Sequence, residues 1–249
     1  MTIEPYWVPV LFVLGIVAGF LNTVAGGGSF FTFPFLIFLG YPPHLANGTI
    51  RVTIVMQNLV GVPTFARSGH FYPRETLIAA LAAIPAALLG ALVAVHLSPD
   101  RFRVISAVLV IVVLVTLFVR PSDWMRTERL PRIRWHLALP LFAAVGFYGG
   151  FFQLGAGMPF LVAAVLGGGW DLVSANSVKV SVILLFSLVA LFVFADSGHV
   201  DWIAGVTIGV GNMLGAWLGA RSAVKRGPGW IRWIMVVMAV LAAVRLLVG

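Results

Sequence analysis

The chain has 249 residues, of which 61% are hydrophobic and only 10% charged, and its mean hydropathy is +1.05. Soluble domains carry about 25% charged residues, so this composition excludes a water-soluble globule and predicts an all-α integral membrane protein. The net charge of +8 fits loop charges that set membrane orientation better than a nucleic-acid partner, and the lack of cysteine excludes disulfides, thiol catalysis and cysteine-based metal sites.

The hydrophobic residues fall into about ten segments when compared with the roughly 20 apolar residues of a membrane-spanning helix. The segments are Trp7–Val24, Ser29–Leu39, Leu45–Ala66, Arg74–Leu97, Phe102–Val119, Trp135–Phe152, Met158–Leu166, Leu172–Ala195, Trp202–Ala220 and Trp230–Val248. The second and the seventh are too short to span a bilayer at about 1.5 Å per residue. We therefore expect short, broken helices at these two places.

The basic residues predict the orientation. With the N-terminus outside, eleven of the sixteen Lys and Arg residues fall in predicted inside loops, as the positive-inside rule requires. Both termini are then outside, and the basic loop 120–134 is cytoplasmic. We expect a multi-pass protein of the inner or plasma membrane.

The two halves of the chain resemble each other. The loop 123–134 separates an N-terminal repeat, 1–122, from a C-terminal repeat, 135–249, within one membrane domain. The matched pairs are Gly19-Phe20 with Gly146-Phe147, Ala46-Asn47 with Ala175-Asn176, and Leu89-Gly90-Ala91 with Leu214-Gly215-Ala216, at offsets of 125 to 129. Five segments per half is an odd number, so the halves enter from opposite faces and form two inverted-topology repeats.

Glycine-rich motifs precede both short segments. The first consists of Gly26, Gly27 and Gly28, followed by Ser29, and the second of Gln153, Leu154, Gly155, Ala156 and Gly157. Consecutive glycines disfavour helix. In transporters with inverted repeats, broken helices aim free N–H groups and positive dipole ends at anions, and Ser29 is placed to cap the short helix that follows it. A plain interfacial turn between two spans is the alternative.

Two polar stripes lie on one face of the third and the eighth segment, at 100° per residue. Their members are Asn47, Arg51 and Asn58 in the third segment, and Asn176, Lys179 and Ser187 in the eighth. Lipid does not accommodate such a stripe, and two cations without a nearby acid predict an anion site. The alternative is that Arg51 and Lys179 snorkel to the interface or bond backbone carbonyls.

Other polar residues are weaker candidates, because each is more often a helix–helix hydrogen bond than a ligand group. They are Asn22, Thr23, Thr49, Thr53, Gln57 and Gln153. The histidines show no metal-binding spacing, and the sequence contains no nucleophile–base pair and no carboxylate pair. We therefore expect no catalytic residue, no metal, no cofactor and no enzyme activity.

The run GFLNTVAGGGSFFTFPFLIFLG…ANGTIRV, its fainter copy GFYGGFFQLGAGMPFL…ANSVKVS, and LGAWLGAR near the end resemble the TauE/SafE family of sulfite exporter-type permeases. The resemblance covers essentially the whole chain. It implies an inverted-repeat transporter for small anions that often contain sulfur, such as sulfite or an organosulfonate. It points to the Gly26–Ser29 and Gly155–Gly157 breaks and to the regions of Asn47 and Asn176. Three glycines stand where many members have four, and Ala156 interrupts the second motif, so the substrate stays open.

Together these features predict a secondary transporter that moves a small sulfur-containing anion by alternating access of two inverted halves. Arg51 and Lys179 would attract the anion, and backbone N–H groups at the breaks would orient it. The expected partners are this anion and the lipid bilayer, with a homodimer as an open alternative and no nucleic acid. An anion channel is the first alternative function, and a membrane-embedded enzyme or assembly factor is the second.

Overall fold

The computed structural model describes residues 5–116, 135–167 and 169–248, and every regular element in these ranges is helical. The elements are α1 (Trp7–Ala25), α2 (Ser29–Phe38), α3 (Pro43–Arg67), α4 (Pro73–His96), α5 (Pro99–Thr116), α7 (Trp135–Phe151), α8 (Gly157–Val162), the π-helical turn η1 (Ala163–Gly167), α9 (Leu172–Asp196) and α10 (Trp202–Val248). The predicted all-α class is confirmed. The predicted connecting loop 123–134 lies outside the described residues.

Four helices in the described part of the chain are long and apolar enough to cross a membrane. They are α1, α4, α9 and the first part of α10, Trp202–Gly227. Helix α3 is as long as α9, with 25 residues each, but its buried face carries Arg51 and several amides. The multi-pass membrane architecture is confirmed, whereas the number of crossings stays a prediction.

The two short segments are half-helices. Helix α2 has 10 residues, and α8 has 6 residues followed by 5 in η1. At 1.5 Å per residue each covers about 15 Å, roughly half of a hydrocarbon core. The predicted ninth and tenth segments are the two helical parts of α10, which a kink separates at Gly227, where φ is 73° and the backbone is not helical.

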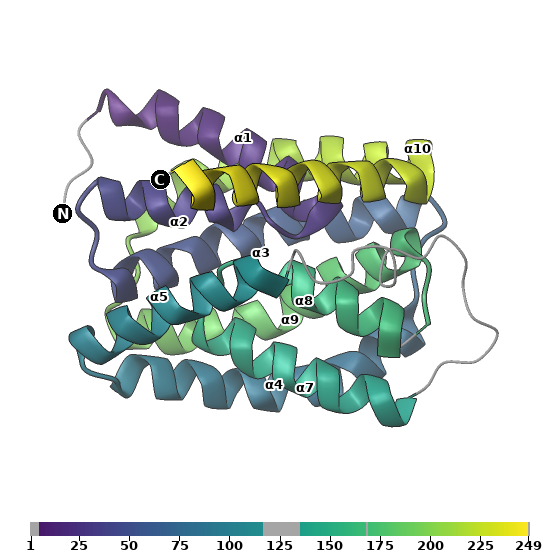
Figure 1. The fold of residues 1–249 in the computed structure, drawn as a ribbon, viewed down its shortest axis with the longest axis horizontal. Helices are drawn as coiled ribbons and strands as arrows, with labels where there is room; N and C mark the ends of the chain where they lie inside the picture. The colour runs from purple at the N-terminus through teal and green to yellow at the C-terminus, as the bar shows by residue number, and fades with distance from the viewer. Residues whose placement is uncertain (1–4, 117–134, 168, 249) are drawn as a thin grey trace.

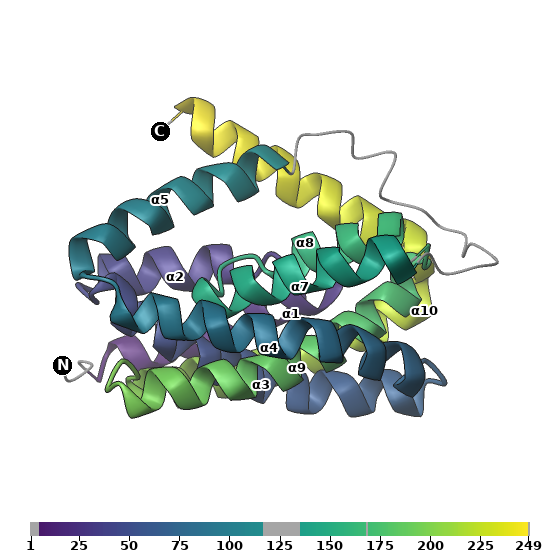
Figure 2. The same ribbon diagram turned by 90° about the horizontal axis from the view of Figure 1, so that it is seen from below.

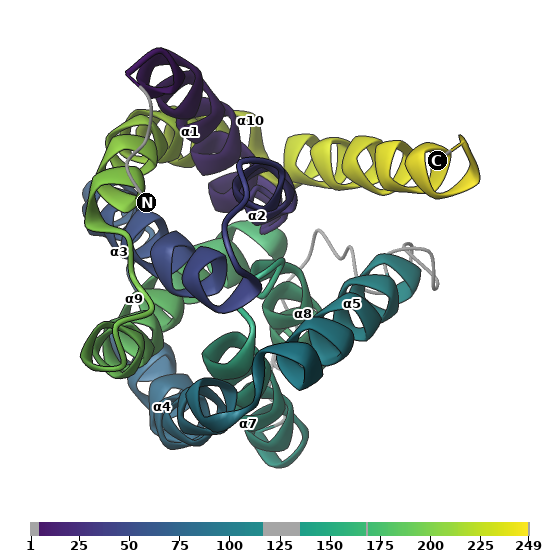
Figure 3. The same ribbon diagram turned by 90° about the vertical axis from the view of Figure 1, so that its left-hand side faces the viewer.

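Six helices form one curved layer, which Figure 3 shows end-on. Neighbours follow the order α1, α10, α3, α9, α4 and α7, and the half-helices α2 and α8 pack on the inner side of this layer. Helix α10 of the C-terminal half thus lies between α1 and α3 of the N-terminal half, and α4 lies between α9 and α7. Helices α3 and α9 lie at the centre of this order, at mid-height in Figure 1. The two halves therefore interlock and share one core.

Glycines allow the outer helices of this layer to approach closely. A Cβ atom at Gly19 of α1 would lie 2.3 Å from the carbonyl oxygen of Asn212 in α10. A Cβ atom at Gly146 of α7 would likewise lie 2.3 Å from the carbonyl oxygen of Ala83 in α4. Small residues serve this purpose in membrane helix pairs. The matched glycines of the two halves therefore have the same role, which is to allow close packing between helices.

Helix α5 and the last part of α10 lie apart from the layer, as Figure 2 shows. The start of α5 is attached to α3 by Phe102, which is fully buried and stacks on His44 with ring centroids 3.9 Å apart. Farther along α5, Val104 and Val108 are exposed.

Candidate functional site

The two helix breaks cross each other in the core. Helix α1 ends at Ala25, and Gly26 turns the chain with a left-handed φ of 83°. A Cβ atom on Gly26 would lie 2.4 Å from the carbonyl carbon of Gly157, and one on Gly157 would lie 2.5 Å from the Cα atom of Gly26. The crossing therefore leaves no room for a side chain on either residue. Both predicted breaks are present, and the fold brings them into direct contact.

The first break is capped by the helix that precedes it. The Asn22 side-chain oxygen Oδ1 accepts hydrogen bonds from the backbone N–H groups of Gly28, at 2.8 Å, and Ser29, at 3.3 Å. The prediction that Ser29 caps α2 is wrong, because Gly28 occupies the cap position and makes no side-chain cap bond. The Ser29 hydroxyl oxygen instead accepts a hydrogen bond from the N–H group of Gly155, at 2.7 Å.

The second break is held by side chains of the N-terminal half. Asn47 of α3 accepts a hydrogen bond from the N–H group of Gln153 at 3.0 Å and donates one to the Phe151 carbonyl at 3.0 Å. Together with the hydrogen bond between the Gly155 N–H group and Ser29, these bonds satisfy backbone groups that have no partner within α7 or α8. Irregular backbone at membrane depth needs such partners.

Arg51 binds the carboxyl end of α7. It is fully buried, and its guanidinium donates to the carbonyl oxygens of Gly149 at 3.0 Å and Gly150 at 2.5 Å, and to the Gln153 side chain at 3.3 Å. The guanidinium carbon also lies 4.4 Å from the centroid of the Phe194 ring. The last carbonyls of a helix lack partners and form the negative end of its dipole. Arg51 therefore completes the end of a helix in the other half.

Lys179 makes the same kind of contact with the halves exchanged. The residue is 1% exposed. Its ammonium group donates to the carbonyl oxygens of Asn22 at 2.9 Å and Thr23 at 3.0 Å, and to Asn176 Oδ1 at 2.5 Å. The Asn176 amide also donates to the Val24 carbonyl at 2.9 Å. Both cations thus bond backbone carbonyls in the interior, which is one of the two alternatives to an anion-facing position, and neither snorkels to an interface.

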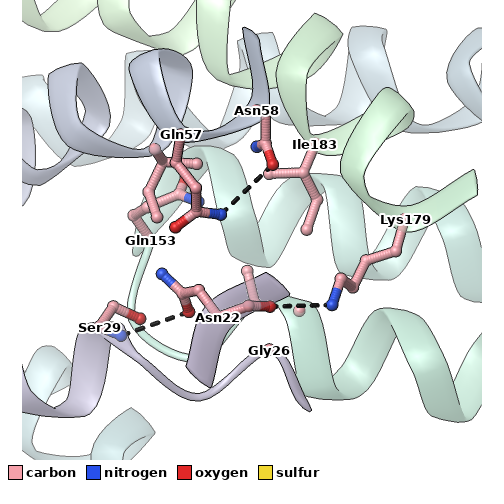
Figure 4. A pocket seen from close by; sticks show the side chains of 11 residues that line it. Asn22, Gly26, Ser29, Gln57, Asn58, Gln153, Lys179 and Ile183 are labelled. Carbon is pink, nitrogen blue, oxygen red and sulfur yellow. Dashed lines mark hydrogen bonds between the residues drawn. The ribbon is translucent and has the colours of Figure 1, made fainter. Parts of the chain in front are cut away.

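A small polar cavity lies beside the crossing. Figure 4 shows the side chains around it, of which the polar ones are Asn22, Ser29, Gln57, Asn58, Gln153 and Lys179. The apolar part of the cavity wall consists of Ile54, Ile183 and Ala156. The free space of about 10 Å³ suits about one water molecule. In this conformation the cavity is too small for an anion of the size of sulfite.

The predicted site residues divide into two sets. Those that line the cavity are Gly26, Ser29, Asn58, Gln153, Gly157 and Lys179. Those that surround it without lining it are Gly27, Gly28, Asn47, Arg51, Gly155, Asn176 and Ser187. Ser187 reaches the cavity wall indirectly, through a 3.5 Å hydrogen bond to Gln153 Oε1. Substrate binding by any of these residues remains a prediction.

Two weak candidates of the sequence, Asn22 and Gln57, line the cavity. The Asn22 and Asn58 amide nitrogens and the Gln57 amide oxygen are buried without a hydrogen-bond partner. The Gln57 nitrogen donates to Asn58 Oδ1 at 3.3 Å. In the sequence, Asn22 could have been identified by its position four residues before a glycine break. Gln57 could have been identified by its position next to Asn58. An unsatisfied buried polar group costs about 1–3 kcal/mol, so these three atoms mark a place for a polar ligand.

The chemistry of this wall favours an anion. It presents amide and hydroxyl donors and one ammonium group beside a single unpartnered acceptor, the Gln57 oxygen, and none of the described residues that line it is a carboxylate. Within the described residues, no three His, Asp or Glu side chains are grouped closely enough to hold a metal ion. A group that brings oxygen acceptors and negative charge is therefore the best match.

The sequence matches the family described as "Sulfite exporter TauE/SafE" over residues 11–246. A "Probable membrane transporter protein" of Sinorhizobium sp. is 30% identical over 95% of this chain and 91% of the relative. Proteins with the same description in Escherichia coli K12 and Haemophilus influenzae are 28% and 27% identical, over 98% and 95% of this chain and 91% and 93% of theirs. No solved structure matches the chain significantly.

Proposed function

The chain belongs to the sulfite exporter TauE/SafE family, and on this basis we propose that it is a secondary transporter for a small sulfur-containing anion such as sulfite or an organosulfonate. The anion crosses the membrane by alternating access of two inverted halves. The observation that carries this proposal is the closed cavity with unpartnered amides, built where the half-helices of both halves cross.

Burial gives this observation its weight. Asn58 is 1% exposed, yet its amide nitrogen has no acceptor. A buried donor without an acceptor is costly in a protein interior, and this cost supports a ligand that supplies the missing acceptor. An anion oxygen placed in the cavity satisfies the Asn58 nitrogen and accepts from the Ser29 hydroxyl, which lines the same space.

The electrostatics also favour an anion. At a helix break, the negative carboxyl end of one helix and the positive amino end of the next lie close together. Lys179 neutralises the carboxyl end of α1, and Arg51 neutralises that of α7. The positive amino end of α2 is then left without an opposing charge. The cations therefore help an anion indirectly, by removing the negative field of the helix ends.

The closed cavity supports a carrier over a channel. It has room for about one water molecule, so the substrate enters only after the halves move. A carrier visits such a closed form in each cycle, whereas a conducting pore needs a continuous path. Saturable flux with counterflow in proteoliposomes indicates a carrier, and single-channel currents would indicate the channel.

Uptake of labelled sulfite into proteoliposomes tests the function. We expect Asn58→Ala to reduce uptake about tenfold, since it removes one charge-assisted donor. The variant also removes the acceptor of the 3.3 Å bond from Gln57, so its Tm is measured beside its uptake. The matched control is Asn212→Ala, which removes another buried amide that does not line the cavity. Equal uptake by both variants, or no uptake of sulfite or sulfoacetate by the unmodified protein, would contradict the proposal.

A further inference from the structure

We infer that the Asn22 carboxamide is an internal competitor of the substrate: in the empty, closed form its oxygen occupies the position at the amino end of α2 that an oxygen of the anion takes on binding. This inference rests on the proposed transport function. It assigns to the site a ligand with a flat or pyramidal three-oxygen head, and it assigns to Asn22 an exchange with that ligand.

The first argument is the position of the Asn22 oxygen. It accepts from two successive N–H groups, those of Gly28 and Ser29, at 2.8 and 3.3 Å. These are the first N–H groups at α2, a helix of 10 residues. Exposed N–H groups and the positive dipole end make this the usual binding place for an anionic oxygen. A neutral amide oxygen is a weaker acceptor for the same pair of donors than a charged oxygen.

The second argument is the other end of the same side chain. Asn22 is 6% exposed, and its amide nitrogen, which lines the cavity side, has no acceptor. Across the cavity, the Asn58 nitrogen and the Gln57 oxygen are also unpartnered, in residues that are 1% and 3% exposed. An anion in place of the carboxamide supplies acceptors to Gly28, Ser29 and Asn58 together.

The backbone and the side chain of Asn22 are bonded independently of each other. The Asn22 carbonyl accepts from Lys179 at 2.9 Å and from the Gly26 N–H at 2.9 Å. The side chain is held only through its oxygen. Rotation about the side-chain bonds therefore exchanges the carboxamide for a ligand without moving the end of α1, and Lys179 stays beside the entering charge.

The volume of this exchange limits the ligand. A carboxamide head has three non-hydrogen atoms, and the cavity holds about one water molecule more. When the halves part and the carboxamide rotates out of this space, the vacated space matches four non-hydrogen atoms, which is the size of sulfite or of the charged head of a sulfonate. Sulfate has one atom more and is expected to bind more weakly.

The C-terminal half has no such competitor. Its counterpart of Asn22, judged by the carbonyls that bind Lys179 and Arg51, is Gly149. A Cβ atom there would lie 2.8 Å from the Phe186 ring, so this position does not accommodate a side chain. The N–H groups of the second break are bonded by Asn47 and Ser29 instead. The structure therefore assigns one exchange site per chain.

The test measures binding of sodium sulfite to the purified full-length protein by calorimetry and by the rise in Tm. We expect Asn22→Ala to bind sulfite roughly fivefold tighter than the unmodified protein, because a helix cap of ordinary strength no longer competes, and to show a larger rise in Tm. Asn22→Asp, whose carboxylate fills the donors permanently, is expected to lose binding. Asn212→Ala is the control for loss of a buried amide and is expected to bind normally.

Weaker sulfite binding by Asn22→Ala than by the unmodified protein, or normal binding by Asn22→Asp, would overturn the inference while the transport function stands. Absence of sulfite and sulfoacetate binding by the unmodified protein would overturn both. If Asn22→Ala unfolds during purification in chloride, recovery of folded protein in sulfite supports the exchange, and equal loss in both salts contradicts it.

Discussion

The break between α1 and α2 and the break between α7 and α8 lie against each other, but different parts of the chain hold them. The N–H groups of the second break are bonded by Asn47 and Ser29, and the carbonyls before it by Arg51, all from the N-terminal half. The first break receives Lys179 from the other half, but its N–H groups are bonded by Asn22 of its own half. The N–H groups of the second break are thus bonded from across the molecule, although Tyr148 of its own half donates to the Leu154 carbonyl, whereas the N–H groups of the first break are bonded locally.

This difference teaches where a ligand can act. The amide oxygen and nitrogen of Asn47 and the two terminal nitrogens of Arg51 are engaged with the second break, and neither residue lines the cavity. The local support of the first break, Asn22, lines the cavity with one end unsatisfied. The second break is therefore the rigid side of the site, and the first is the side that can respond to substrate.

The largest effect is expected from filling the crossing itself. Gly26→Ala adds a Cβ atom against the Gly157 backbone at a φ of +83°, so strain and overlap together cost about 3–5 kcal/mol. Gly157→Ala has the overlap without the strained φ and is expected to cost less. Gly198→Ala, with a φ of +72° and open space around it, isolates the strain at about 1–2 kcal/mol. The measure is Tm in detergent, and a Gly26→Ala variant no less stable than Gly198→Ala contradicts the close crossing.

The next largest effect is expected from removing the buried cations. Arg51→Met leaves two carbonyls of α7 and the Gln153 oxygen without their donor and removes the contact with Phe194. Each buried acceptor left unpaired costs about 1–3 kcal/mol, so we expect a loss near 3 kcal/mol in the free energy of unfolding.

Lys179→Met removes the donor to two carbonyls of α1 and to the Asn176 side chain. We expect a somewhat smaller loss in the free energy of unfolding than for Arg51→Met, since no ring contact is lost. This variant is also expected to lower sulfite affinity, because Lys179 lines the cavity and Arg51 does not. The control is Arg221→Met, an exposed residue over the Trp217 ring, which is expected to change little. Stable, fully active variants at both buried positions would show that the helix ends do not need these cations.

The smallest effect is expected from Ser29→Ala. It leaves the Gly155 N–H without its 2.7 Å acceptor, which costs about 1–2 kcal/mol. Ser187→Ala, which loses only a 3.5 Å bond to Gln153, is the comparison and is expected to be nearly neutral. Thermal unfolding of the two variants side by side measures the difference. A larger loss for Ser187→Ala would mean that the contact between the two breaks contributes little.

The sequence alone determined the features that depend on local chemistry. Hydropathy set the membrane class, and the glycines around Gly26 and Gly155 set the two breaks, because consecutive glycines disfavour helix wherever they occur. The lengths of α2 and of α8 with η1 followed from the same apolar runs. The match between Asn47 and Asn176, and between Arg51 and Lys179, was likewise visible as a repeated pattern.

Only the tertiary structure decided what those polar residues touch. A helical wheel places Arg51 and Asn58 on one face of α3, but it does not say that Arg51 meets carbonyls 98 and 99 residues away while Asn58 meets a cavity. Asn22 looked like an ordinary helix–helix contact until the crossing of the two breaks placed its amide beside Lys179 and Asn58. These pairings depend on how the interlocked halves close around the glycine crossing. Because that packing is long-range, no local pattern in the sequence specifies it.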